Sequence, residues 1–202
     1  MRILIAVPTF ETIFPETFKS IYDLDTGGHE ALFEYVRGYD VAVARNKIAK
    51  RAMELDVDRV LMVDNDTVVP HDALVNLAGH GKEVVLGYYA HRPKAGDYDG
   101  RSNVCRLGPV DYVDQYQMDE LKALASEGTY LERVHGGGMG CALISTDIFR
   151  ETEYPWFDWV KYKNGLYLSE DLFFCEVCRK NRIPIYVDTR VSCGHVFRYV
   201  QD

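Results

Sequence analysis

Short apolar runs alternate with helix-like segments through residues 1–90, and this alternation restricts the fold more than any other feature of the sequence. Aliphatic and β-branched residues concentrate in runs short enough for single buried strands, at residues 3–7, 32–36, 59–63 and 83–87. Helices are expected between them, at 15–23, 41–55 and 71–78, with Asp40 at the N-cap of the second. Strands that alternate with helices form βαβ units, so the sequence predicts an α/β fold with a mainly parallel sheet flanked by helices.

The second half of the chain is less regular. Helices are expected at 117–126, 146–150 and 170–180, and strands at 131–134, 141–144, 185–187 and 191–193. Asn164-Gly165, between Tyr162 and Tyr167, predicts a hairpin turn. At 202 residues the chain suits one domain over 1–202, with a nucleotide-binding-like half (1–100) and a more irregular half (101–202).

Charge and composition narrow the functional classes. The net charge of −8 argues against a general binder of nucleic-acid backbones, because such proteins carry a basic face. The N-terminal apolar run is too short for a signal peptide and no stretch is long enough to cross a bilayer, so a cytoplasmic location without a transmembrane segment is expected. Five irregularly spaced cysteines predict reduced, mostly buried thiols rather than a disulfide framework.

Two aspartates, Asp64 and Asp66, directly follow the predicted strand 59–63. In parallel α/β sheets, ligands bind beyond the carboxyl ends of the strands. Carboxylates one residue apart at such a place can both reach one divalent cation, which neutralises a diphosphate. The alternative is a solvated turn, since Asp and Asn favour turns.

One enzyme class that uses such a pair is the phosphatases with a covalent aspartate. Residues 63–69 resemble the first motif of haloacid-dehalogenase-type phosphatases, in which Asp64 would attack the phosphate and Asp66 would act as acid or base. Two features depart from that family. A full βαβ unit precedes Asp64, and Glu170-Asp171 are expected to open a helix rather than to close a strand.

Six short motifs also follow one another along nearly the whole chain. They are the first strand with Pro8-Thr9, then Val43-Ala44-Arg45-Asn46, Asp64-Asn65-Asp66, the glycine-rich run 136–144, Ser169-Glu170-Asp171, and Cys193-Gly194-His195. In this order they resemble the glycosyltransferases of the GT-A fold, the family-2-like nucleotide-diphospho-sugar transferases. The resemblance implies a Rossmann-like mixed sheet and a C-terminal half that binds the acceptor.

The resemblance also implies a role for each motif. The residues expected to bind the nucleotide sugar are Pro8, Thr9, Arg45, Asn46, Asp64, Asn65, Gly137 and Gly138. Those expected to hold a metal ion are Asp64, Asp66 and His195. The catalytic carboxylate of inverting members corresponds to Asp171, with Glu170 beside it.

The chemistry of sugar transfer agrees with these roles. Departure of a nucleoside diphosphate needs its charge stabilised, and carboxylates with a neutral imidazole suit Mn²⁺, with Mg²⁺ as an alternative. The hydroxyl of the acceptor (glycan, lipid-linked sugar, protein or small molecule) is a poor nucleophile, so a carboxylate such as Asp171 must remove its proton. The expected activity is therefore that of a metal-dependent, inverting glycosyltransferase. A sugar-nucleotide-binding domain without catalysis remains an alternative.

Several of these residues have structural alternatives. Arg45 can be a surface cation, Glu170-Asp171 can complement the helix dipole, and the glycines can form a flexible turn. Cys175, Cys178, Cys193 and His195 invite a zinc site, but the first two lie in an apolar helix and are expected in the core. His91, Arg92 and Lys94 are basic residues that a diphosphate could meet or that solvent could surround. The aromatic residues of 154–162 are expected to pack in the core, with Trp156 the candidate for stacking on a sugar.

Overall fold

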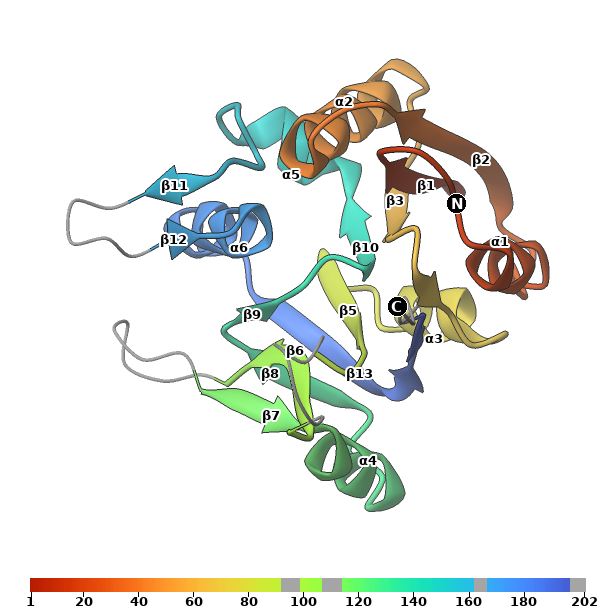
Figure 1. The fold of residues 1–202 in the computed structure, drawn as a ribbon, viewed down its shortest axis with the longest axis vertical. Helices are drawn as coiled ribbons and strands as arrows, with labels where there is room; N and C mark the ends of the chain where they lie inside the picture. Colours follow the sequence, from red (N-terminus) through yellow and green to blue (C-terminus); the bar gives the residue numbers. More distant parts are fainter. Residues whose placement is uncertain (92–98, 107–113, 162–166, 197–202) are drawn as a thin grey trace, which may run out of the picture.

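A central sheet of seven strands organises the computed structural model (Figure 1), which describes residues 1–91, 99–106, 114–161 and 167–196. The strand order is β2-β1-β3-β10-β5-β13-β8. In that order the strands are Glu30–Arg37, Arg2–Thr9, Arg59–Val63, Cys141–Ser145, Val84–Tyr88, Ile185–Ser192 and Leu131–Val134. The sheet therefore takes strands from both halves of the chain.

Five of the seven strands run in one direction. β1 is parallel to β2 and β3, and β13 is parallel to β5. The exceptions are β10, which lies antiparallel between β3 and β5, and β8, which is antiparallel to β13 at the edge. The carboxyl ends of β1, β3, β5 and β13 consequently meet at one edge of the sheet, together with the start of β10.

Helices cover both faces of the sheet (Figure 1). The helices are α1 (Pro15–Tyr22), α2 (Val41–Glu54), α3 (Ala73–Gly79), α4 (Met118–Ser126), α5 (Thr146–Glu151) and α6 (Glu170–Lys180). One face packs against α2, α4, α5 and α6, through residues such as Ile48, Leu121 and Phe174. The other face packs against α1 and α3, through Ile21, Leu74 and Leu77. The molecule thus has an α/β fold, in which a mixed sheet lies between two layers of helices.

Three smaller sheets are also present among the described residues. β6 (Arg101–Cys105) pairs with β7 (Gln115–Gln117) and with β9 (Gly136–Gly137). β4 (Thr67–Val68) pairs with β14 (Gly194–His195). β11 (Val160–Lys161) pairs with β12 (Tyr167–Leu168), as the predicted hairpin requires, although the turn residues Asn164 and Gly165 lie outside the described residues.

Most expected elements are confirmed to within two residues. Asp40 caps α2, since its carboxylate accepts a hydrogen bond from the Ala42 amide. One prediction is wrong. The expected strands 185–187 and 191–193 form one strand, β13. Its pairing with β5 is irregular between Val187 and Ser192, and in the sequence this irregularity looks like a gap between two strands because the apolar pattern is interrupted there.

All five cysteines are free and buried, as expected. No helix in the described ranges is both long and apolar enough to span a membrane.

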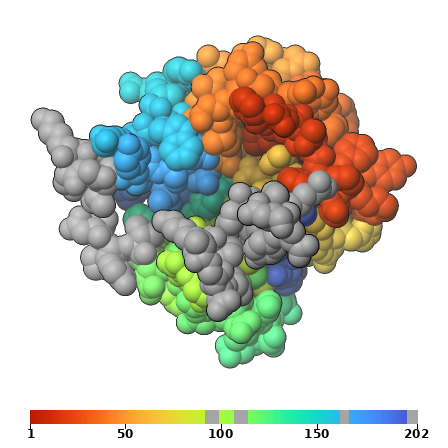
Figure 2. All heavy atoms as spheres, viewed as in Figure 1, coloured from red at the N-terminus to blue at the C-terminus, as the bar shows by residue number. Residues whose placement is uncertain are grey.

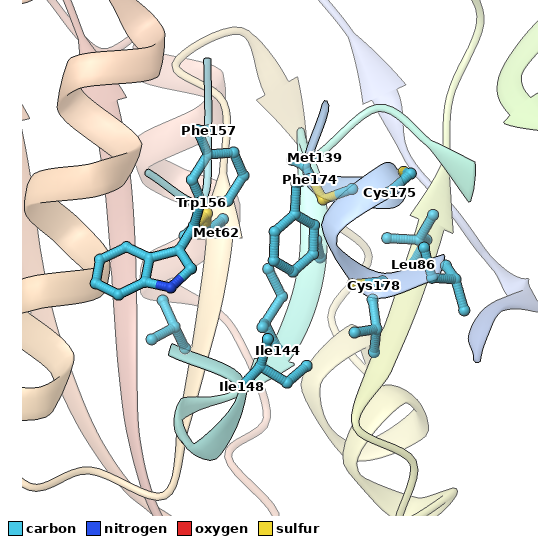
Figure 3. Packing of buried hydrophobic residues seen from close by; sticks show 14 of the residues in the cluster. Met62, Leu86, Met139, Ile144, Ile148, Trp156, Phe157, Phe174, Cys175 and Cys178 are labelled. Carbon is cyan, nitrogen blue, oxygen red and sulfur yellow. The ribbon is translucent and has the colours of Figure 1, made fainter. Parts of the chain in front are cut away.

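Phe174 anchors α6 in the hydrophobic core on one face of the sheet. Its ring is fully buried and stacks on that of Phe157, with 4.9 Å between ring centroids (Figure 3). Met139 and Ile144 lie beside it. Because α6 begins with Glu170 and Asp171, this packing also fixes where those two carboxylates lie.

Replacing Phe174 by alanine should lower the free energy of unfolding by about 3–5 kcal/mol, because a buried aromatic ring leaves a cavity. Urea denaturation followed by circular dichroism measures the change. The control is Tyr22→Ala, whose residue is 78% exposed and should change stability by less than about 0.5 kcal/mol. Equal losses in the two variants would contradict this assignment of the core.

Candidate active site

The carboxyl edge of the sheet gathers residues that are far apart in the chain. Thr9 ends β1, Asp64 follows β3, and Tyr89 follows β5. Gly140 directly precedes β10, and its carbonyl accepts a hydrogen bond from the Asp64 amide (3.0 Å). Parallel α/β sheets bind their ligands at this edge, so the arrangement marks the candidate site.

The pairing of β4 with β14 brings His195 to Asp66. Thr67 is the register partner of His195, and the Val196 amide donates to the Asp66 carbonyl (2.8 Å). The His195 Nε2 atom lies 3.4 Å from Asp66 Oδ2. On the other side of the ring, Nδ1 lies 2.9 Å from the Ala90 carbonyl oxygen, which can only accept, so Nδ1 carries a proton. The imidazole is therefore oriented with Nε2 toward the aspartate.

Arg45 connects three carboxylates at the centre of the site. Its Nη2 donates to Asp64 Oδ1 (2.7 Å), and its Nη1 contacts both Glu170 and Asp171. The Arg45 side chain is 1% exposed, so the alternative of a surface cation is wrong. α2, the end of β3 and the start of α6 are thereby held together by one guanidinium.

One positive charge does not neutralise three carboxylates. The pKa of Asp171 is raised to about 7, because burial, Glu170 and Asp64 raise it by more than Arg45 lowers it. For Arg45 itself, burial lowers the pKa, but Asp171, Asp64 and Glu170 outweigh this and the net pKa is raised. The site thus keeps an excess of negative charge that favours a proton or a cation.

Tyr89 is a site residue that the sequence analysis missed. Its buried hydroxyl accepts a hydrogen bond from the Gly140 amide (3.1 Å), and its ring makes an edge contact with His195 at 5.2 Å between centroids. A Cβ on Gly140 would lie 2.7 Å from this hydroxyl and 2.9 Å from Asp64 Oδ2, and one on Gly138 would also clash with the hydroxyl. These two positions therefore need glycine because a side chain would clash with Tyr89, and not because the chain must form a flexible turn there.

Two adjoining hollows meet at the carboxylates. One, of about 440 Å³, is bounded by Pro8, Thr9 and Asn65, and the other, of about 280 Å³, by Tyr89, Asn103, Gly138 and His195. Asp64, Asp66 and Asp171 line both hollows. Figure 2 shows the surrounding parts of this face, with the N-terminal elements in red and orange, the α5–α6 region in cyan and blue, and the β6–α4 region in green.

Two of the expected nucleotide-binding residues lie away from these hollows. Asn46 is buried, donates from Nδ2 to the carbonyls of Phe157 and Ala42, and accepts at Oδ1 from the Trp156 amide (3.1 Å). Its amide is fully used in tying α2 to the segment before β11. Gly137 is buried in β9, where a Cβ would lie 3.0 Å from the Asn103 carbonyl oxygen. Both residues thus pack beneath the site and do not line its hollows.

The expected metal ligands divide into two groups. Asp66 and His195 lie together, whereas the Asp64 carboxylate pairs with Arg45. Within the described ranges, no three His, Cys, Asp or Glu side chains converge as a complete metal site. A cation held here would need ligands from a bound molecule as well, as Mg²⁺ commonly does with substrate phosphates.

The remaining candidates from the sequence differ in where they lie. Cys175 and Cys178 lie in the core on one face of the sheet and Cys193 in the core on the other, so these thiols do not gather around a zinc ion. Trp156 is 4% exposed and packs against Phe149, which removes it as a platform for a sugar. Tyr154 and Trp159, expected in the core, are instead exposed. His91 lines the smaller hollow, and Arg92, Lys94 and Tyr162 fall outside the described residues.

Comparisons with known proteins add a likeness of fold. No protein-family model matches the sequence, and no curated protein is significantly similar to it. Among solved structures, A197 from STIV superimposes with a TM-score of 0.65 at 19% identity, over 98% of this chain and 87% of that chain. At this level of identity the likeness shows the shared α/β fold and carries no function across.

The pKa of Asp171 predicts a pH dependence of stability. A carboxyl whose pKa rises from its usual 3.8 to about 7 on folding binds its proton more tightly in the folded state, so stability falls as pH rises between these values. In Asp171→Asn this loss should disappear, and the decrease in unfolding free energy between pH 5 and 8 should shrink by at least about 1.4 kcal/mol.

Urea denaturation at several pH values, with a chelator present, measures this difference. The control Asp119→Asn replaces a carboxylate whose side chain is 95% exposed and should keep the wild-type slope. A wild-type slope in Asp171→Asn would show that Asp171 is not held in this environment.

Proposed function

We propose that this chain is a metal-dependent glycosyltransferase of the GT-A type. In this proposal it transfers a sugar from a nucleoside-diphosphate sugar to a hydroxyl acceptor, with inversion at the anomeric carbon. The observation that carries the proposal is the convergence, at one sheet edge, of the Asp66–His195 pair with the Arg45-linked carboxylates Asp64, Glu170 and Asp171. These are all five residues that the family resemblance assigns to metal binding and catalysis, and Arg45, which links three of them, is assigned to the nucleotide sugar.

Asp66 and His195 fit a divalent cation such as Mn²⁺ or Mg²⁺. The His195 Nδ1–H donates to a backbone carbonyl, which is the outer contact that usually orients a metal-binding imidazole. Asp66 supplies a carboxylate oxygen beside Nε2. When bound there with the diphosphate, the cation supplies positive charge to the leaving group. Asp64 supports this site through its negative charge, since its own carboxylate is engaged by Arg45.

Asp171 is the group best suited to accept the proton of the acceptor hydroxyl. It lines both hollows, and its pKa of about 7 lies where a general base works well at neutral pH. Arg45 and the Met139 amide hold its carboxylate in position. As the acceptor oxygen bonds to the anomeric carbon and the bond to the diphosphate breaks, the hydroxyl proton passes to Asp171.

The two hollows suggest separate places for the two substrates. The larger one, beside Pro8, Thr9 and Asn65, suits the nucleotide, because these are the residues that the resemblance assigns to it. The smaller one, beside Tyr89 and Asn103, then receives the acceptor. The anomeric carbon would lie between them, next to the shared carboxylates.

The phosphatase alternative finds less support. Asp64 Oδ1 pairs with a buried arginine, which leaves only Oδ2 to attack a phosphate. Glu170 and Asp171 open helix α6 rather than closing a strand, which departs from the late motif of those phosphatases. Geometry therefore favours sugar transfer, and the experiments below include an arm for the alternative.

Thermal unfolding with a panel of nucleoside diphosphates, each with and without Mn²⁺, tests the donor site. One diphosphate should stabilise the protein only when Mn²⁺ is present, by about 2.7 kcal/mol at a hundred times its Kd. Asp66→Asn should remove the metal-dependent part, and the exposed control Asp119→Asn should retain it. Stabilisation by vanadate that Asp64→Asn abolishes would support the phosphatase instead.

Release of nucleoside diphosphate from a panel of nucleotide sugars tests catalysis. Asp171→Asn should reduce turnover by about 10²–10⁴-fold, because the base is lost, while donor affinity stays within a few-fold of wild type. A chain that binds the donor tightly yet releases no diphosphate, in wild type and variant alike, would be a binding domain without catalysis.

A further inference from the structure

A third hollow lies at the edge of the central sheet, apart from the two hollows of the candidate active site. It measures about 290 Å³ and lies between the end of α6, strand β8 and the turn that leads into β13. Arg133, Arg179 and Arg182 line it, over an apolar floor that includes Val134 and Ile183. None of its lining residues belongs to either hollow of the candidate active site. We call it the arginine pocket.

Two of the three arginines lack carboxylate partners among the residues that the structure describes. Arg179 pairs with Glu176 (2.5 Å), and this glutamate also lies 4.0 Å from His135 Nε2 in the wall of the pocket. For Arg133 and Arg182, the described part of the chain provides no ion pair or side-chain hydrogen bond. Arg133 and Arg182 are both exposed and line the same hollow, so on a chain with a net charge of −8 they form a local positive site.

Arg182 also has an unfavourable backbone conformation. Its φ is +60°, in the left-handed region, and its amide donates to the Arg179 carbonyl just beyond the end of α6. Glycine is the usual residue at such a helix end, and a residue with a Cβ costs about 1–2 kcal/mol there. An arginine at this position therefore places a guanidinium at the pocket at the expense of stability.

The attraction between basic residues and a helix C-terminus explains only part of this cluster. It accounts for Arg179 and Lys180, which lie in the last turn of α6. It does not account for Arg133, which comes from strand β8, or for an arginine rather than glycine at position 182. A ligand that engages both unpaired side chains accounts for them together.

We propose that the arginine pocket binds a phosphoryl group, carried by a small phosphate ester or a lipid headgroup. Guanidinium groups donate paired hydrogen bonds to phosphate oxygens, and a phosphate carries close to two negative charges at pH 7, matching Arg133 and Arg182. The organic part of the ligand would lie on Val134 and Ile183. The inference does not depend on the proposed function, because the pocket shares no residue with that site.

Calorimetric titration of the whole chain with inorganic phosphate and glycerol phosphate tests the small-molecule source. Sedimentation with phosphatidylcholine vesicles, with and without phosphatidic acid, tests the lipid source. Excess EDTA in both experiments removes metal-dependent binding at the candidate active site. We expect saturable binding in one of the two experiments, and that experiment identifies the source.

Arg182→Gly separates ligand binding from folding. Glycine suits the left-handed conformation, so this variant should unfold at the same temperature as wild type or higher, yet bind at least tenfold more weakly. Arg133→Gln should weaken binding similarly. Arg150→Gln changes the net charge equally at an arginine that pairs with Asp56 and Asp147, and should bind like wild type.

Three results would overturn the proposal. They are the absence of saturable binding in both experiments, wild-type affinity in Arg182→Gly and Arg133→Gln, and an equal loss in Arg150→Gln, which would indicate attraction to net charge alone. Because EDTA is present throughout, a failure here leaves the metal-dependent donor test unaffected, and the reverse also holds.

Discussion

The buried contact of Arg45 with three carboxylates is the interaction on which the candidate site depends. Asp64 directly follows strand β3, Glu170 and Asp171 begin a helix more than 100 residues later, and one guanidinium from α2 joins them. Removing one member of a buried ionic cluster leaves the others uncompensated and costs several kcal/mol. The chain therefore retains this arrangement only if the whole cluster forms, which couples the shape of the cleft to the packing of α2 and α6.

The cluster is also electrostatically incomplete, and this links structure to the proposed chemistry. Asp171 is buried and two further carboxylates share its arginine, so it holds its proton up to a pH of about 7. A divalent cation nearby would relieve the same excess of negative charge. The charge imbalance thus costs stability in the isolated chain. In the proposed function it would become useful when a cation and an anionic substrate bind together, since the cation would contact both.

The sequence could predict the local elements and the edge of the sheet where the site lies, because apolar periodicity and N-caps act over a few residues. It could not predict partners that only the tertiary fold selects. The sequence left two positions possible for Arg45, on the surface or in the site, because its carboxylate partners lie 19, 125 and 126 residues away along the chain. Asn46 shares a motif with Arg45 but points to the backbone of Trp156 and Phe157. Tyr89 has no motif at all, and only the two glycines that make room for its hydroxyl hint at it.

The acidic motif that suggested a single metal-binding unit consists of two parts. The Thr67 amide donates to the Asp64 carbonyl (3.1 Å), so residues 64–67 form a tight turn, and such a turn is compatible with the proposed ligand-binding role. This turn sends the Asp64 carboxylate toward Arg45 and the Asp66 carboxylate toward His195. Two acids one residue apart thereby serve two elements, α2 and β14, that are remote in sequence. Spacing alone shows that two carboxylates are near each other, but the backbone between them decides whether they share a ligand.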